Sequence, residues 1–368
     1  MDLDVLRGCA MCSGKKIILT GGGTAGHVLP NITLLPYLQE LGFDVYYVGS
    51  HGGIEQGLVE FSGIPYFGIS SGKLRRYFDL RNFTDIFRIM KGVWDSNKIL
   101  RRIKPDIIFS KGGFVVVPLI FAAKLRGIKV VIHESDLTPG LANRLVEPIA
   151  NKVLVSFPET LKYVPKKKSI LTGIPVRADL ASANKEDGLR FLEFLANGNP
   201  IMLVMGGSQG SAAINACVRG VLPRLLEQFR VVHLCGRGNR SGIELDGYKE
   251  YEMLNRDLSN VLKAADIVVS RAGANTLFEI LALKKPNLLI PLTLGQSRGD
   301  QIINAESFRQ RGFSVILDEE FLSERFLDEV SKLYISRDKY VEAMGKVELG
   351  DAAKEIVGAI LDTLNSSA

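Results

Sequence analysis

The chain has 368 residues, of which 46% are hydrophobic and 23% are charged, an ordinary balance for a water-soluble globular protein. This length suits two α/β domains better than one core, and four cysteines are too few for a disulfide framework, which favours a reducing compartment. Because no apolar run approaches the roughly 20 residues that span a bilayer, we expect neither a transmembrane helix nor a secretory signal. The expected location is cytoplasmic.

The first predicted strand, residues 16–20, ends in a glycine turn, and residues 1–14 before it are expected to form a flexible extension. Gly21, Gly23 and Gly26 match the spacing G-x-G-x-x-G, in which backbone N–H groups approach a pyrophosphate at a helix N-terminus. A dinucleotide site also needs an acid at the end of the second strand, whereas strand 43–48 has its only acid, Asp44, near its beginning. The turn therefore predicts a phosphorylated ligand and speaks against a nicotinamide cofactor.

His27 follows this turn, at the expected first turn of a helix. A core histidine would be unusual there, since ligands bind at the carboxyl edge of a parallel sheet. A helix N-terminus disfavours the charged imidazole and leaves a neutral ring that can accept a proton. His27 is therefore a candidate general base.

Residues 73–104 carry ten basic side chains against three acidic ones, a local charge of +7 in a chain whose total is +6. Apolar residues such as Phe87 and Trp94 are interleaved with these cations. Some of them belong to the core, but a basic amphipathic element of this kind also suits an anionic membrane surface. Nucleic acid is the alternative, and because no nucleic-acid-binding module is recognisable we expect no such partner.

Short apolar runs alternate with helical patterns along the chain, which is typical of parallel sheets covered by helices on both faces. The expected strands are 16–20, 43–48, 106–110, 129–134 and 152–157 in the first half, and 201–205, 230–235, 267–270, 287–291 and 313–317 in the second. We predict an α/β protein with two doubly wound, Rossmann-like domains that face a central cleft. The expected domains are residues 15–177 and 178–350, followed by a C-terminal helix in 351–368 that can pack back on the first domain.

Three polar segments of the second half lie where strands meet helices. Turn 206–210 contains Ser208, whose hydroxyl either caps the next helix or binds a phosphate. In segment 270–279, Thr276 and Glu279 have capping-box spacing; the alternative is a helix N-terminus that takes a diphosphate while Glu279 holds a ribose. The polar run 297–304 favours ligand contact.

Motifs of several other reaction classes are missing. The only Asp-x-Asp triplet is Asp2-Leu3-Asp4, and there is no His-Glu-x-x-His, Gly-x-Ser-x-Gly or Walker A lysine. We therefore expect no metal and no cofactor, and we disfavour hydrolysis and ATP-driven phosphoryl transfer.

Seven motifs, in this order and spacing, together resemble one family, the bacterial MurG peptidoglycan N-acetylglucosaminyltransferases, which convert lipid I to lipid II. They are Gly-Gly-Gly-Thr-Ala-Gly-His-Val-Leu-Pro at 21–30, Ser-Lys-Gly-Gly-Phe at 110–114, His-Glu-Ser-Asp at 133–136, Thr-Gly-Ile-Pro-Val-Arg at 172–177, Gly-Gly-Ser-Gln-Gly at 206–210, Ser-Arg-Ala-Gly-Ala-Asn-Thr at 270–276 and Ser-Arg-Gly-Asp-Gln at 297–301. Many members have Tyr in the place of Phe114 and Asn in the place of Asp136.

The resemblance implies a GT-B fold, with the acceptor bound mainly by the N-terminal domain and UDP-GlcNAc mainly by the C-terminal one. The implied donor-binding residues are Thr24, Ala25, Gly26, Asn143, Arg177, Ser208, Asn255, Arg271, Ala274, Asn275, Thr276, Glu279, Gln301 and Asn304, of which Asn143 lies on the acceptor side beside Glu134. The acceptor-side residues are Gly22, Gly23, Gly113 and Asn215.

The implied reaction is a metal-independent, inverting transfer of GlcNAc from UDP-GlcNAc to lipid I at the inner leaflet, a step of peptidoglycan synthesis on which cell shape and division depend. The attacking hydroxyl must lose a proton, for which His27 is the first candidate and Glu134 the second. Stretch 73–104 (Lys73 to Lys104) would hold the enzyme on the cytoplasmic face of the membrane. The alternatives are a related transferase that acts on diacylglycerol and a nicotinamide-dinucleotide-binding oxidoreductase or sensor. No oligomeric state is predicted.

Overall fold

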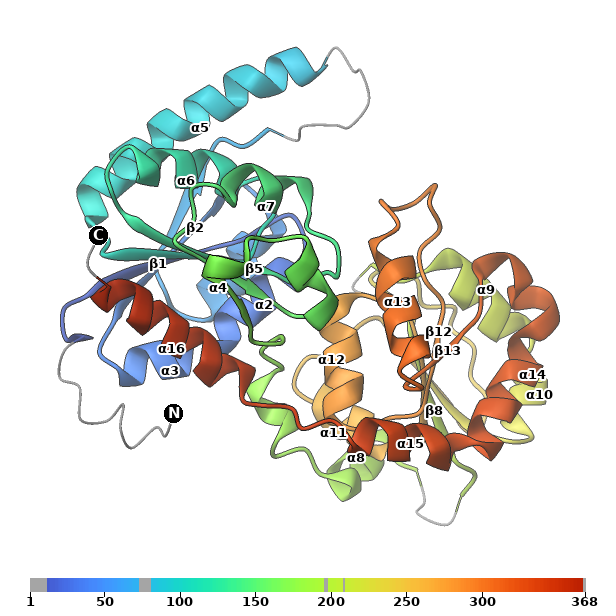
Figure 1. Ribbon diagram of the computed structural model, residues 1–368. Coiled ribbons are helices and arrows are strands. Elements are labelled where there is room, and N and C mark those ends of the chain that lie inside the picture. Colours follow the sequence, from blue (N-terminus) through green and yellow to red (C-terminus); the bar gives the residue numbers. More distant parts are fainter. Residues whose placement is uncertain (1–11, 73–80, 195–197, 208, 367–368) are drawn as a thin grey trace. The chain divides into compact units, whose positions relative to one another are not determined.

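The computed structural model describes residues 12–72, 81–194, 198–207 and 209–366 and consists of two compact units (Figure 1). Unit 1 comprises Met1–Arg177 and Gly350–Ala368, and unit 2 comprises Ala178–Leu349. Each unit has one parallel sheet with helices on its faces, which confirms the predicted Rossmann-like α/β class. The predicted cleft between the domains stays a prediction.

The sheet of unit 1 has seven strands within the described residues, in the order β3-β2-β1-β4-β5-β6-β7. They are β1 (Lys16–Thr20), β2 (Asp44–Ser50), β3 (Tyr66–Ile69), β4 (Ile107–Ser110), β5 (Lys129–Glu134), β6 (Lys152–Val155) and β7 (Ser169–Leu171). Thr20 on β1 pairs with Ser110 on β4, and this register brings the two segments that follow, each rich in glycine, to the same edge of the sheet.

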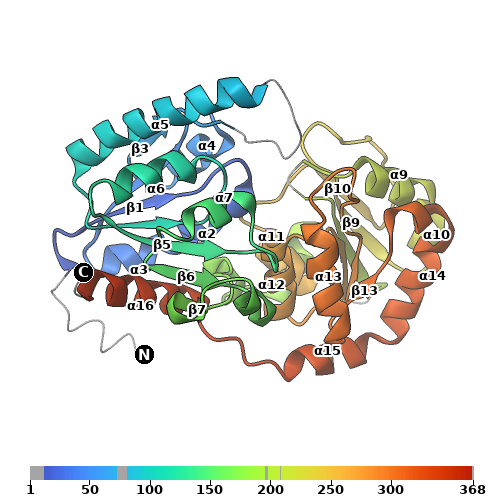
Figure 2. The ribbon, with the colours of Figure 1, turned by 45° about the horizontal axis from the view of Figure 1, so that its top comes forward.

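Two layers of helices cover this sheet. Apolar side chains of α2 (Ala25–Thr33), α3 (Leu35–Glu40), α4 (Ile54–Phe61) and the C-terminal α16 (Ala352–Asn365) share one core with Ile17, Leu19, Ile107 and Phe109. Those of α5 (Arg81–Ile103), α6 (Val116–Lys124) and α7 (Leu141–Val146) share the other with Ile18, Ile108 and Ile132. Neighbouring residues of one strand thus point to opposite cores, as strand geometry requires. Figure 2 shows α5 and α6 on the same side of the sheet.

The sheet of unit 2 has the order β10-β9-β8-β11-β12-β13. Its strands are β8 (Ile201–Met205), β9 (Arg230–Leu234), β10 (Tyr248–Tyr251), β11 (Ile267–Ser270), β12 (Asn287–Leu289) and β13 (Val315–Ile316). Its helices are α8 (Lys185–Leu192), α9 (Ala212–Gly220), α10 (Leu222–Leu226), α11 (Leu258–Ala264), α12 (Ala274–Ala282), α13 (Asp300–Gln310), α14 (Leu322–Ile335) and α15 (Arg337–Gly345).

Short 3₁₀ turns complete the described elements at Pro158–Lys162, Lys166–Lys168, Ala178–Leu180 and Glu319–Phe321. Across the ranges that the structure describes, no helix combines the length and the apolar character needed to cross a bilayer.

Candidate active site

The two glycine loops of unit 1 meet at the topological switch point of its sheet. The strand order reverses between β1 and β4, and open α/β sheets bind ligands at the carboxyl ends of the strands at such a point. The Gly22 N–H donates to the Gly112 carbonyl over 3.3 Å. Gly113 has a φ of +87°, and a Cβ on it would lie 2.3 Å from the Gly22 oxygen, so only glycine fits. The predicted acceptor-side residues Gly22, Gly23 and Gly113 therefore lie close together at this edge of the sheet.

His27 lies in the first turn of α2, which starts with Ala25 and Gly26 after the N-cap residue Thr24. Its Nδ1 is 3.0 Å from the Gly22 carbonyl oxygen and 3.3 Å from Thr24 Oγ1. Because a carbonyl oxygen can only accept, Nδ1 carries the proton, and the lone pair of the neutral ring is on Nε2. The predicted base thus has a fixed tautomer, with Nε2 as its proton-accepting atom.

The carboxylate of Glu134, at the end of β5, is bound by the loop that follows this strand. It accepts from the Asp136 N–H over 3.0 Å, the Gly140 N–H over 2.9 Å and the Asn143 side-chain amide over 2.8 Å. Burial and the charge of Asp136 raise the pKa of Glu134, while these three hydrogen bonds oppose the rise. Asn143 Oδ1 is buried and has no hydrogen-bond partner in the described part of the chain. Glu134 and Asn143 are therefore in direct contact.

Lys111, which was not predicted as a site residue, is buried next to this loop. Its Nζ lies 2.7 Å from both His133 Nδ1 and Ser135 Oγ. His133 Nε2 is 2.8 Å from the Gly173 carbonyl, so Nε2 carries the ring proton and Nδ1 accepts from Lys111. Burial lowers the pKa of Lys111 to about 7, although neighbouring carboxylates raise it. Lys111 and His133 thus connect the ends of β4 and β5 to Gly173, in the segment that leads to Arg177. Arg177 is half-buried and is the last residue of unit 1 before the chain enters unit 2.

Arg271, which follows β11 in unit 2, is 8% exposed and its guanidinium binds within the unit. Nη1 donates to the Ile290 and Pro291 carbonyls, each over 3.1 Å. Nη2 donates to Ser211 Oγ over 2.7 Å and forms a short ion pair with Glu319. Four of its five N–H groups are thus satisfied by loops at the carboxyl edge of the sheet. Arg271 therefore holds these loops together, and its predicted contact with the donor stays a prediction.

Gln301 and Asn304 of α13 hold the backbone of Ala272. Gln301 Oε1 accepts from the Ala272 N–H over 3.3 Å and from the Leu292 N–H over 3.2 Å. Asn304 is fully buried, and its Nδ2 donates to the Ala272 carbonyl over 3.4 Å. The structure therefore brings Arg271, Gln301 and Asn304 together just before α12.

The N-terminus of α12 lies directly after this cluster. Its N-cap residue is Gly273, with no hydrogen bond from a capping side chain. Thr276 is the third residue of the helix, so the capping-box interpretation of Thr276 and Glu279 is wrong, because the capping residue must precede the helix. Ala274, Asn275 and Thr276 form the first turn, where backbone N–H groups lack partners within the helix and favour an anion. Glu279 lies one turn further along α12 and is half-buried.

Asn215 is buried in unit 2. It was predicted on the acceptor side, but it lies on α9 in unit 2 and is 4% exposed. Its Oδ1 is 2.9 Å from His233 Nε2, and its Nδ2 donates to the Cys235 carbonyl over 2.9 Å. Both ends of the amide are engaged inside the unit, so Asn215 supports the loop after β9, and its predicted acceptor-side role stays a prediction.

His233 connects Asn215 to a polar network on the neighbouring strand β10. Its Nδ1 lies 2.9 Å from Tyr248 Oη, and that hydroxyl lies 2.9 Å from Glu250 Oε1. Glu250 also accepts from Arg219 Nη2 over 2.7 Å. Burial alone would raise the pKa of Glu250, but hydrogen bonds from Arg219, Ser241 and Tyr248 lower it to about 2. Burial lowers the pKa of His233 to about 4, although Glu250 opposes this shift.

This network predicts an acid-sensitive unit 2. Between pH 6.5 and about 4 the unfolded state binds a proton on His233 that the folded state does not bind, so stability falls as pH falls, by up to roughly 3 kcal/mol. His233→Gln should flatten this dependence, measured by hydrogen exchange of β9 and β10 at both pH values. The matched variant His51→Gln, at an exposed position of unit 1, should leave it unchanged. An unaltered pH dependence in His233→Gln would contradict the prediction.

Three predictions fall partly or wholly outside these clusters. Ser208 lies outside the described residues, and the helix after its loop, α9, is capped by Ser211, whose Oγ accepts from the Ile214 N–H over 3.3 Å. Asn255 lies exposed in the loop between β10 and α11. Within the basic stretch, positions 73–80 are outside the described residues and α5 begins at Arg81.

Glu55 is the second residue that was not predicted. It lies in the first turn of α4, is fully buried, and its Oε2 accepts from the Gly23 N–H over 3.3 Å. The available signal was the glycine-rich segment 49–53 that follows strand β2 and precedes this acid. The acid expected after the second strand of a dinucleotide site is thus present, five residues beyond the strand, but it faces the glycine turn instead of a ribose.

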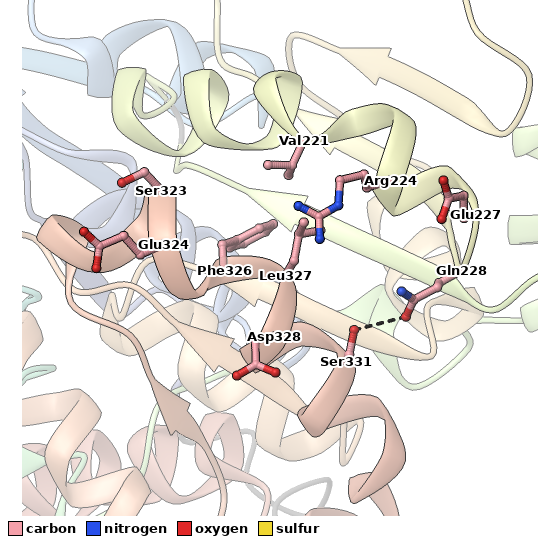
Figure 3. A pocket seen from close by; sticks show the side chains of 10 residues that line it. All are labelled: Val221, Arg224, Glu227, Gln228, Ser323, Glu324, Phe326, Leu327, Asp328 and Ser331. Carbon is pink, nitrogen blue, oxygen red and sulfur yellow. Dashed lines mark hydrogen bonds between the residues drawn. The ribbon is translucent and has the colours of Figure 1, made fainter.

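A surface pocket of unit 2 contains none of the predicted site residues. It is lined by side chains of α10 and α14, among them Arg224, Glu324 and Asp328, and Ser331 Oγ donates to Gln228 Oε1 over 3.0 Å at its edge (Figure 3). Among the described side chains, no three His, Cys, Asp or Glu residues gather as a metal site. The metal-free reaction stays a prediction.

Comparison with known proteins gives the class and the family. Residues 17–155 match the glycosyltransferase family 28 N-terminal domain, and residues 201–357 match the family 28 C-terminal domain. With two parallel α/β domains that carry glycine loops at their switch points, the chain is a glycosyltransferase of the GT-B fold.

It is 52% identical over 349 residues to the UDP-N-acetylglucosamine–N-acetylmuramyl-(pentapeptide) pyrophosphoryl-undecaprenol N-acetylglucosamine transferase of Lachnoclostridium phytofermentans, which covers 94% of this chain and 98% of the relative. The protein of the same name from Clostridium tetani is 51% identical, with 94% and 97% covered. The chain belongs to this family, as the resemblance predicted. MurG of Acinetobacter baumannii has the same fold, with a TM-score of 0.73 at 23% identity over 95% of this chain and 99% of that one.

Proposed function

We propose that this protein transfers GlcNAc from UDP-GlcNAc to lipid I and so forms lipid II for peptidoglycan synthesis. The observation that carries the proposal is the 52% identity, over 94% of the chain, to a relative named for N-acetylglucosamine transfer to N-acetylmuramyl-(pentapeptide) pyrophosphoryl-undecaprenol. The geometry within each unit supports it, because both switch points carry glycine loops next to a helix N-terminus.

In the proposed reaction, the acceptor hydroxyl attacks the anomeric carbon while UDP leaves from the opposite face, with inversion. His27 Nε2 takes the hydroxyl proton, since Nδ1 is bound to Gly22. The N-terminus of α12 stabilises the charge that develops on the departing diphosphate. Asn143 Oδ1, a buried acceptor, offers a hydrogen bond to an acceptor sugar beside Gly112.

The test is a transfer assay with the full chain, radiolabelled UDP-GlcNAc and a lipid I analogue. We expect a labelled disaccharide lipid, and no labelled product when diacylglycerol replaces lipid I. Thermal protection by UDP-GlcNAc but not by NADH would separate this function from the dinucleotide alternative. Absence of transfer to lipid I in the presence of folded protein would refute the proposal.

We further propose that α5 attaches the protein to the cytoplasmic face of the membrane, where a lipid-linked acceptor resides. Phe87, Met90 and Trp94 are 73%, 64% and 57% exposed and recur at the spacing of one helix face. Arg88 and Lys91 are exposed beside them. Aromatic residues at headgroup level together with cations are typical of an interfacial helix on anionic lipid.

The double variant Arg88→Glu/Lys91→Glu should weaken binding to anionic vesicles by at least about tenfold, because each cation near such a surface contributes about 1 kcal/mol. Co-sedimentation at low and at physiological salt measures this loss. The matched control Lys332→Glu/Lys346→Glu makes the same charge change at exposed positions of unit 2 and should bind normally. Equal weakening in both variants would show that net charge, and not α5, governs attachment.

A further inference from the structure

Glu55 is a fully buried carboxylate in a cavity shaped to hold it. Oε1 accepts from the Ser50 N–H over 2.8 Å and from the Ser50 hydroxyl, and Oε2 accepts from the Gly23 N–H. A Cβ at Gly22 would lie 2.5 Å from Oε1, and Cβ atoms at Gly49 and Gly53 would also collide with this side chain. None of the described residues forms an ion pair with it. A buried carboxylate needs hydrogen bonds to compensate its lost hydration, and the backbone and side chain of Ser50 together with Gly23 supply them here.

The peptide bond that Glu55 binds is the one that binds His27. The Gly23 N–H and the Gly22 carbonyl belong to the same planar peptide group. Glu55 Oε2 accepts from its N–H side over 3.3 Å, and its carbonyl side accepts from His27 Nδ1 over 3.0 Å. The carboxylate, the peptide and the imidazole therefore form one hydrogen-bonded chain.

Such a chain has a known physical effect. A carboxylate on the N–H side polarises the peptide and strengthens its carbonyl as an acceptor, because hydrogen bonds in series reinforce one another. A carboxylate bound directly to a catalytic histidine fixes its tautomer and orientation and stabilises the imidazolium that forms. Here the Gly22–Gly23 peptide lies between the carboxylate and the imidazole and transmits the same effect. Its carbonyl binds the Nδ1 proton of His27 and leaves Nε2 as the proton-accepting nitrogen.

We propose that Glu55 is a positioning residue for His27: through the Gly22–Gly23 peptide it holds the imidazole in the Nδ1–H tautomer and so directs the proton-accepting Nε2 to the substrate. This inference rests on the proposed function, in which His27 is the base. It predicts that Glu55 affects the chemical step through His27 and has little influence on UDP-GlcNAc binding.

Glu55→Gln tests this assignment. The amide oxygen can keep the Ser50 donors, which turns the NH₂ group toward the Gly23 N–H and breaks the link to the peptide. We expect kcat to fall about 10- to 100-fold, by analogy with the loss of a partner that orients a metal-binding histidine, with an unchanged KM for UDP-GlcNAc. The matched control Glu60→Gln, at an exposed position of the same helix, should retain the normal rate.

A double-mutant cycle gives the decisive readout. In a His27→Ala background, Glu55→Gln should change the rate less than about twofold, because the group on which it acts is gone. Equal losses in both backgrounds would overturn the proposal and assign Glu55 a merely structural role. Ser50→Ala removes one donor to the carboxylate and should give a smaller loss with the same dependence on His27, so it replaces Glu55→Gln if that variant does not fold.

Nitrogen-15 NMR of the imidazole rings measures the tautomer of His27 independently of transferase activity. The chain has four histidines, and a His27→Ala spectrum assigns the His27 resonances. We expect the Nδ1–H tautomer in the unaltered protein and a mixture with Nε2–H in Glu55→Gln, because the tautomer is set by the partner of the other nitrogen. An unchanged tautomer would overturn the inference, whereas a missing transfer activity with the expected tautomer shift would count against the proposed function alone.

Discussion

His27→Ala should lower kcat about 10²- to 10⁴-fold, the usual contribution of a general base, while the KM for UDP-GlcNAc changes little. The reason is geometric. The ring belongs to the first turn of α2 in unit 1, whereas Arg271, Gln301 and the N-terminus of α12, the cluster near which we expect the donor diphosphate, belong to unit 2. Initial rates with radiolabelled UDP-GlcNAc and a lipid I analogue, at saturating acceptor, measure the loss.

Glu134→Gln is the comparison that separates the two candidate bases. Burial raises the pKa of Glu134, which would suit a base, but its oxygens already accept hydrogen bonds from Asp136, Gly140 and Asn143. We therefore expect this variant to disturb the loop after β5 and to lower kcat less than His27→Ala does. A near-normal rate in His27→Ala together with a large loss in Glu134→Gln would transfer the role of base to Glu134.

The central strands of both sheets could be predicted because each is a buried apolar run between helical patterns. All ten predicted strands are present, and the three strands that were missed in the described ranges, β3, β7 and β10, lie at sheet edges. Each of these edge strands is only partly buried, and β10 reads Tyr-Lys-Glu-Tyr, so it lacks the continuous apolar pattern by which strands were recognised. Edge strands need less burial than central ones, and the sequence signal weakens accordingly.

The candidate site residues could be predicted where they belong to one short sequence motif, as do Gly22, Gly23 and His27 in the glycine turn after β1. A site residue could not be predicted where its side chain contacts the site from a segment distant in the sequence. Glu55 reaches the glycine turn only because β2 pairs with β1 and α4 then turns back over the strand ends. Nothing in the local sequence of Asn215 shows that His233 and the Cys235 carbonyl take up both ends of its amide.

Arg271→Met is expected to cost unit 2 about 3–5 kcal/mol, because removing one partner of a buried ion pair leaves the other charge uncompensated. The Glu319 side chain is only 15% exposed, and the Ile290 and Pro291 carbonyls and Ser211 lose their donor at the same time. Methionine keeps the unbranched shape of the side chain, so the loss reports the guanidinium. Hydrogen exchange in β11 and β12, with β1 and β4 of unit 1 as internal reference, localises the effect.

Arg309→Met is the matched control, since its pair with Glu306 lies on the exposed surface of α13 and should contribute little to stability. The same two variants decide between the roles open to Arg271. If it holds the loops that precede α12, its loss lowers the stability of unit 2 and raises the KM for UDP-GlcNAc together, because the first turn of that helix is displaced. A raised KM at unchanged stability would instead restore the predicted direct contact between Arg271 and the donor, since a side chain that binds only the ligand contributes nothing to the unliganded fold.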